Sequence, residues 1–220
     1  MKTSSKIHRL AAVALAAAAL AGNASAALVT YTGADNSVTS VASLVNSNAA
    51  AAAFDAATGP LSLLTFESGV PAGVSITGGG NITNDSGCGP LCGINVTPSG
   101  QNFLMMFATT ATFNFTSPVN AFGMYVTGLQ TDIVPQETVT FTDGSSQVLN
   151  LPSSVSGGGA FIGFTDIGKS ISSVTFNSTN DFVAVDDVRY GVTAVPEPST
   201  YAMLLLGLGL TGFAVRRQKR

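Results

Sequence analysis

The stretch ATFNFT, residues 111–116, alternates aromatic and polar side chains without a break. Successive side chains of a β-strand point to opposite faces of a sheet, so Phe113 and Phe115 share one face and the polar residues share the other. Val139 and Phe141 repeat the same period of two. This alternation predicts strands with one buried and one solvent-facing side, which is typical of antiparallel sheets.

Similar short segments follow one another along the chain and are separated by Gly, Ser, Asn and Pro. Asp143-Gly144 predicts a tight hairpin in which both central residues have positive φ. Strands at this spacing predict an all-β fold, an antiparallel jelly-roll-type sandwich formed by one domain over residues 27–194. The predicted strands are residues 61–67, 73–77, 102–108, 111–115, 119–127, 137–142, 147–151, 160–165, 171–177 and 182–190.

A single short helix is expected before these strands. Residues 48–57 (NAAAAAFDAA) are dominated by Ala, the strongest helix former. Asn46 or Ser47 is the candidate N-cap, and Gly59-Pro60 ends the helix.

The N-terminal residues are typical of a secretory signal peptide. Lys2, Lys6 and Arg9 precede the apolar run 10–21, and the motif Ala24-Ser25-Ala26 follows it. A charged start, a short apolar core and an Ala-x-Ala site predict cleavage between Ala26 and Ala27 by signal peptidase. Residues 1–26 are therefore expected to be absent from the exported protein.

The C-terminal residues 195–220 have three parts in a fixed order. Val195-Pro196-Glu197-Pro198 comes first, an apolar span at 201–215 follows, and a basic tail ends the chain. Fifteen helical residues rise about 22 Å, less than the bilayer core of about 30 Å. The tail is expected on the cytoplasmic side, where Lys and Arg accumulate.

This order resembles the PEP-CTERM sorting signal, which is read by exosortase, a membrane protease-transpeptidase of Gram-negative bacteria. The resemblance implies a short transmembrane helix that holds the precursor in the inner membrane only transiently, while the Pro-Glu-Pro motif is presented for cleavage. It also implies that the processed protein reaches the cell surface or the extracellular space.

The composition of the body excludes several classes of function. Residues 27–195 keep Lys169 and Arg189 as their basic residues against eleven acids, a net charge of about −9. Such a body is not expected to bind nucleic acid, because Lys and Arg supply that affinity. The single histidine, His8, lies in the predicted signal peptide, so Ser-His-Asp catalysis and His-ligated metal sites are excluded. A Ser-Lys dyad would have to use Lys169.

Two acidic stretches are the candidate metal ligands. Phe66-Glu67 lies near the first strand, and Asp186-Asp187-Val188 lies in the last. This framing resembles jelly-roll carbohydrate-binding and adhesion modules, in which matching carboxylates hold a structural calcium. The resemblance implies Ca²⁺ bound by Glu67 with Asp186 or Asp187, because Ca²⁺ prefers oxygen ligands. The alternatives are solvated strand-edge acids, with Asp186 at a bulge, or the two carboxylates of a glycosidase.

Cys88 and Cys92 flank the short stretch Gly89-Pro90-Leu91. In an exported chain such a pair predicts a local disulfide. Their spacing does not fit a redox Cys-x-x-Cys motif, and a zinc site would need four ligands.

The sequence therefore predicts an exported surface or extracellular-matrix protein with no catalytic residues. One alternative is a module that binds exopolysaccharide, which would need an exposed aromatic pair on a concave sheet face, with Tyr125 or Tyr190 as candidates. The other is a glycosidase, which would need two carboxylates converging in a pocket.

Overall fold

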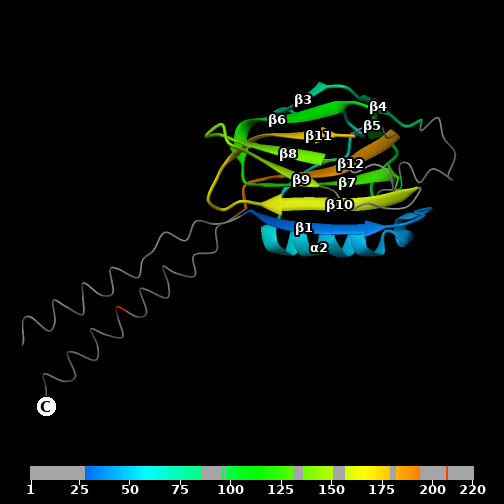
Figure 1. Cartoon of the computed structure of the whole chain (residues 1–220), viewed down its shortest axis with the longest axis horizontal. Coiled ribbons are helices and arrows are strands. Elements are labelled where there is room, and N and C mark those ends of the chain that lie inside the picture. The colour runs from blue at the N-terminus through cyan, green and yellow to red at the C-terminus, as the bar shows by residue number, and fades with distance from the viewer. Residues whose placement is uncertain are drawn as a thin grey trace, which may run out of the picture.

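The structure, a computed structural model, describes residues 28–85, 96, 98–130, 136–150, 157–178, 182–193 and 207. Two antiparallel sheets lie face to face and one helix, α2, lies outside them (Figure 1). This is an all-β jelly-roll-type sandwich with one short helix near its N-terminal end, and it confirms the predicted fold class.

The larger sheet, sheet A, has seven strands, and β2 pairs with β12 outside its main path. The main path runs in the order β1 (Val29–Asp35), β10 (Gly158–Thr165), β7 (Ala121–Leu129), β12 (Phe182–Gly191), β5 (Phe103–Phe107) and β4 (Asn81–Thr83), and β2 is Ser62–Leu64.

The smaller sheet, sheet B, has five strands. Their order is β3 (Val74–Gly78), β6 (Thr110–Val119), β11 (Ile171–Asn177), β8 (Gln136–Phe141) and β9 (Ser146–Asn150).

Phenylalanine rings fill the space between the sheets. Phe122 of β7 is fully buried and contacts Phe113 and Phe115 of β6 at centroid distances of 5.6 and 6.0 Å, and Phe164 of β10 at 5.7 Å. Tilted and edge-on ring pairs at these distances stabilise a core beyond the area they bury. Phe113 and Phe115 therefore face inward, as their alternation predicts.

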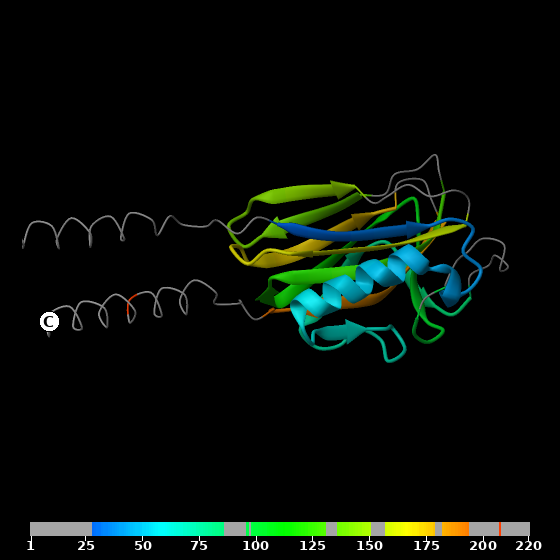
Figure 2. The ribbon, with the colours of Figure 1, turned by 90° about the horizontal axis from the view of Figure 1, so that it is seen from below.

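Helix α2 (Val45–Thr58) lies against the outer face of sheet A, over β1 and β10 (Figure 2). Its fully buried Phe54 contacts Tyr31 at 5.6 Å and Phe161 at 5.7 Å. Gly123 and Gly163 make room for this ring, because an added Cβ would lie 3.3 and 2.8 Å from its atoms. A second apolar core thus fixes the helix on this sheet.

The N-terminus of α2 is held by a residue that sequence reasoning did not choose. Asp35, at the end of β1, accepts the backbone N–H groups of Asn46 at 2.9 Å and Ser47 at 2.8 Å. The N-cap position belongs to Leu44, whose side chain makes no capping bond, so the prediction of Asn46 or Ser47 as N-cap is wrong. Burial acts to raise the pKa of Asp35, but the bonds from Asn46 and Ser47 outweigh it and lower the pKa. A carboxylate is stabilised there by four donors near a helix N-terminus.

The strands agree with the predicted segments to within a few residues, with two exceptions. β1 and β4 have no expected counterpart: β4 has only three residues, and the alternation in β1 extends only over Val29–Thr32. The turn at Asp143-Gly144 joins β8 to β9 as predicted, but only Gly144, at φ 81°, has a positive φ. Phe141 and Ser145 close the hairpin, with the Phe141 N–H donating to the Ser145 carbonyl at 2.9 Å. The loop is therefore longer than the tight turn that Asp143-Gly144 predicts.

Among the described residues, no helix has the length and apolar character to cross a membrane. The predicted transmembrane span at 201–215 lies outside these residues except for Gly207.

The second core, between α2 and sheet A, can be tested by replacing Phe54. We expect Phe54→Ala to lower the free energy of unfolding by about 3–5 kcal/mol, because it leaves a cavity between helix and sheet. Phe107→Ala is the matched control: Phe107 is 65% exposed, and its replacement is expected to change stability by less than about 1 kcal/mol. Urea unfolding of both variants gives the comparison. Equal losses would show that α2 is not held by Phe54.

Candidate functional site

Glu67 and Asp187, two of the three predicted metal ligands, bind the same short segment, residues 99–102. Glu67 Oε1 accepts the N–H groups of Gln101 at 2.6 Å and Asn102 at 2.5 Å. Asp187 accepts the N–H of Ser99 at 3.2 Å and its hydroxyl at 2.5 Å. The fold thus brings residues distant in sequence to one loop, from β12 and from the chain beyond β2.

Unusual backbone geometry surrounds this loop. Phe66, next to Glu67, has φ 61°, and Asp187 has φ 50°. Residues other than Gly rarely adopt such angles, which cost about 1–3 kcal/mol each. The register of β12 with β7 shifts between Asp186 and Arg189, so Asp187 lies in a β-bulge. The bulge aims Asp187 at the loop.

Asp186, the third candidate, is fully buried, and its Oδ1 accepts the N–H of Asp187 at 2.7 Å. In the part of the chain that the structure describes, no group of three acidic, His or Cys residues is arranged to hold a metal ion. Glu67 and Asp187 accept hydrogen bonds from N–H and O–H groups of the loop, whereas Ca²⁺ takes about 6–8 oxygen ligands. Calcium at Glu67, Asp186 and Asp187 stays a prediction.

Glu137 is a buried acid that sequence reasoning did not select as a candidate site residue. It lies on β8, two residues before the inward-facing Val139, and it is fully buried. Among the residues that the structure describes, neither of its carboxyl oxygens has a hydrogen-bond partner. Its register neighbours are Phe176 on β11 and Leu149 on β9, both apolar. The period of two that places Val139 inside also places Glu137 inside, and this signal was available in the sequence.

The environment of Glu137 decides its protonation. Burial raises the pKa of the Glu137 carboxyl well above its ordinary value of 4.5. A buried carboxyl without a cationic partner avoids the cost of an isolated charge by keeping its proton. The two basic residues of the body are engaged elsewhere: Lys169 pairs with Asp143 and Arg189 pairs with Asp55. Burial therefore favours the neutral form of Glu137 inside the sandwich.

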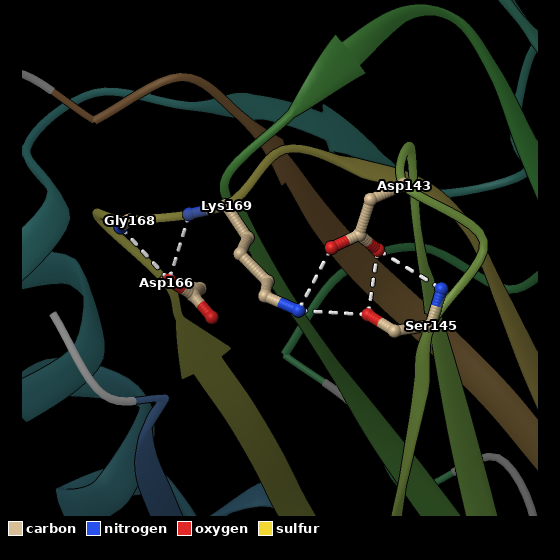
Figure 3. A network of polar contacts seen from close by, with 5 residues as sticks. All are labelled: Asp143, Ser145, Asp166, Gly168 and Lys169. Carbon is tan, nitrogen blue, oxygen red and sulfur yellow. Dashed lines mark hydrogen bonds and ion pairs between the residues drawn. The ribbon is translucent and has the colours of Figure 1, made fainter. Parts of the chain in front are cut away.

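Lys169 takes part in a surface network rather than in a catalytic dyad (Figure 3). Its Nζ lies 2.9 Å from Asp143 Oδ2 and donates to Ser145 Oγ at 2.8 Å. Ser145 Oγ in turn donates to Asp143 Oδ1 at 2.6 Å. An ammonium that donates to both groups has no lone pair with which to take a proton from Ser145. The network joins the β8–β9 hairpin to the β10–β11 loop, where Asp166 accepts the N–H groups of Gly168 and Lys169 at 2.8 and 2.9 Å.

Tyr125 and Tyr190 do not form the exposed aromatic pair that carbohydrate binding was expected to need. Tyr125 is 1% exposed, and its hydroxyl donates to Asn48 of α2 at 2.8 Å. Burial raises the pKa of Tyr125 to about 12 against the opposing charge of Arg189. Tyr190 stacks on Phe115 at 5.6 Å and packs against the core between the sheets. Tyr125 is therefore a core residue, and Tyr190 is partly buried against the other core.

A different aromatic pair lies at the surface. Phe107 of β5 is 65% exposed, and its ring centroid lies 6.0 Å from that of its cross-strand partner Phe182 of β12. This pair lies beyond the strands that α2 contacts.

A groove of about 500 Å³ opens between β3 and β4, at the edge of the sandwich. None of the described residues that line it is acidic, so it does not supply the pair of carboxylates that a glycosidase needs. The lining residues are Val70, Val74, Ser75, Ile76, Gly78, Gly79, Gly80, Asn81, Ile82 and Leu104.

The remaining predicted sites lie outside the described residues. They are the signal cleavage site (Ala24, Ala26 and Ala27), the predicted disulfide (Cys88 and Cys92) and the sorting motif (Val195, Pro196, Glu197 and Pro198).

Comparison with known protein families identifies the C-terminal segment. Residues 194–219 match the family model of the PEP-CTERM protein-sorting motif. This match confirms the resemblance seen in the sequence, and it covers the Pro-Glu-Pro motif, the apolar span and most of the basic tail. A PEP-CTERM motif marks an exported protein that exosortase sorts. No curated protein matches the chain.

Solved structures similar to the sandwich include carbohydrate-binding modules. A mutant of CBM29-2 matches with a TM-score of 0.40 and 10% identity, over 64% of this chain and 99% of that one. The CBM22-1 xylan-binding domain from Paenibacillus barcinonensis Xyn10C matches with a TM-score of 0.40 and 15% identity, over 63% and 98%. An exo-beta-agarase matches with a TM-score of 0.41 and 13% identity, over 62% of this chain and 25% of the agarase.

The neutral state of Glu137 predicts a pH dependence of stability. Its folded pKa is raised, so its contribution to stability is complete below pH 4.5 and is lost as the pH rises through the folded pKa. Relative to the wild type, Glu137→Gln should therefore gain melting temperature between pH 4 and pH 8, because the amide cannot ionise. Calorimetry across this pH range measures the difference.

Asp143→Asn gives a control of opposite sign. Hydrogen bonds from Ser145 and Lys169 lower the pKa of Asp143, so its contribution is present at neutral pH and lost in acid. The prediction would be contradicted if the melting temperatures of the wild type and Glu137→Gln changed with pH in parallel. That result would show that a partner stabilises the charged form of Glu137 in solution.

Calcium binding predicts a second effect on stability. A cation that binds only the folded state stabilises it by about 2.7 kcal/mol at a hundredfold excess over its dissociation constant. A chelator should then lower the melting temperature by several degrees, and Glu67→Gln should remove the difference. Equal melting temperatures with calcium and with chelator would leave Glu67 as a carboxylate that only holds the 99–102 loop.

Proposed function

We propose that this chain is a non-catalytic component of the cell surface or extracellular matrix, released there after exosortase cuts its C-terminal motif. Signal peptidase would first remove residues 1–26. The span 201–215 would then hold the precursor in the inner membrane until cleavage. The observation that carries the proposal is the match of residues 194–219 to the PEP-CTERM motif.

The described body supports a role without catalysis. The chain has no histidine after His8. Lys169 forms an ion pair with Asp143 and donates a hydrogen bond to Ser145. Glu67 and Asp187 are engaged by backbone and hydroxyl donors of one loop. Glu67 and Asp187 thus hold a loop of the sandwich, and a net charge of about −9 favours solubility of such a domain.

Carbohydrate binding is the second candidate function, and one observation favours it. Phe107 and Phe182 offer adjacent rings on the outer face of sheet A. Exposed aromatic side chains present an apolar face on which a sugar ring can stack. A glycosidase is not proposed, because no described pair of carboxylates converges on the groove between β3 and β4.

Cleavage at the motif is tested by intact-mass analysis of the extracellular protein, which we expect to lack residues 201–220. Glu197→Ala should leave a membrane-bound precursor that retains the whole chain. Ser199→Ala is the matched control, since it changes a neighbour and keeps the Pro-Glu-Pro motif. Extracellular protein that still carries Leu204–Leu206 would contradict the proposal.

A further inference from the structure

The outer face of sheet B differs from the other surfaces of the sandwich. Helix α2 contacts β1, β10 and β7, all of sheet A, so it does not cover this face. The strands of sheet B carry a single charged residue, Glu137, and that side chain points into the core. The outer face is therefore uncharged, in a body with a net charge of about −9.

Two rows of small polar side chains cross this face at right angles to its strands. One row follows the register Thr77, Thr112, Thr175 and Thr138. The neighbouring row follows Ser75, Asn114, Ser173 and Thr140. We call the two rows together the hydroxyl face. Neighbouring strands lie about 4.8 Å apart, so each row repeats at that interval.

The side chains of the hydroxyl face hold one another in place. Thr112 and Thr175 share a hydrogen bond of 2.8 Å between their hydroxyl oxygens. Asn114 Nδ2 donates to Thr77 Oγ1 at 3.1 Å. Each hydroxyl still has further donor or acceptor capacity. At these four of the eight side chains, less side-chain entropy is therefore lost when a ligand binds.

The propensity of Thr for strands explains why hydroxyls occur on an exposed sheet face. It does not explain where the charges lie. The described acids and bases are found on α2, at turns, at strand ends and in the bulge of β12, for instance Asp55, Asp143 and Asp187. Acidic polymers are repelled by the body as a whole, whereas a neutral polymer meets no charge on this face.

We propose that the hydroxyl face binds a neutral, hydroxyl-rich polysaccharide in the extracellular matrix. The inference rests on the proposed extracellular role and names its partner. The rows offer both donors and acceptors, which match the hydroxyl groups of a glycan, and the Thr methyl groups contact its C–H surfaces. Five twisted strands rotate by about 20–25° each, so the face suits a single flexible chain better than a flat crystalline surface.

The test uses affinity gel electrophoresis of the processed protein in gels that contain glucomannan, hydroxyethylcellulose or alginate. We expect retardation by the two neutral polymers and none by the anionic alginate. The variant Thr112→Val/Thr138→Val/Thr175→Val removes three hydroxyls at constant shape, and each lost hydrogen bond weakens binding several-fold. We expect its dissociation constant to rise by at least about tenfold.

Thr30→Val/Thr32→Val is the matched control, because both residues are exposed on β1 at the edge of sheet A. It should bind as the wild type does, and all variants should keep the wild-type melting temperature within a few degrees. Phe107→Ala tests the aromatic pair on the other sheet.

Three outcomes would overturn the inference: no retardation by either neutral polymer, unchanged binding by the triple Val variant, or binding lost in Phe107→Ala and kept in the triple variant. The last would assign the sugar to the aromatic pair. None of these outcomes affects the proposed sorting, which intact-mass analysis tests by itself.

Discussion

The packing of Phe122 between the two sheets is the interaction on which the rest of the structure depends. Its ring touches Phe113 and Phe115 from sheet B and Phe164 from sheet A, with all four rings buried. Once these rings face inward, alternation along each strand assigns every other side chain to an outer face. The core thereby decides what each sheet shows to its surroundings. Small residues at Gly123 and Gly163 come to lie outside sheet A, and polar residues come to lie outside sheet B.

The same constraint places Glu137 where its charge is not tolerated. It shares a face of β8 with Val139 and Phe141, so the rings that fix the sheet also draw this carboxyl into the core. No described residue partners it there, and burial favours its neutral form. The two cations of the body stabilise surface junctions instead. Arg189 lies between Asp55 of α2 and the rings of Tyr125 and Phe161, each 5.5 Å away, and so ties the helix to sheet A.

The outer faces of the two sheets differ in the size and polarity of the side chains that they present. On sheet A, the missing side chains of Gly123 and Gly163 leave a recess that Phe54 fills, and α2 is held there. On sheet B, Thr, Ser and Asn side chains stand on the outer face and offer hydrogen bonds instead. One outer face is therefore packed against α2, and the other is not.

The sequence by itself determined the all-β class, most strand positions and the sorting motif, because alternation, turn residues and a linear motif are local properties of the chain. The alternation with Val139 and Phe141 is equally local, and it predicts the inward position of Glu137. Only the tertiary structure decided that Asp35 caps α2, that Tyr125 is buried beneath that helix and that Glu67 and Asp187 bind one loop. Each of these depends on strand order and register between segments far apart in sequence. Long-range pairing of this kind is fixed by how the two cores fill space, and no local pattern encodes it.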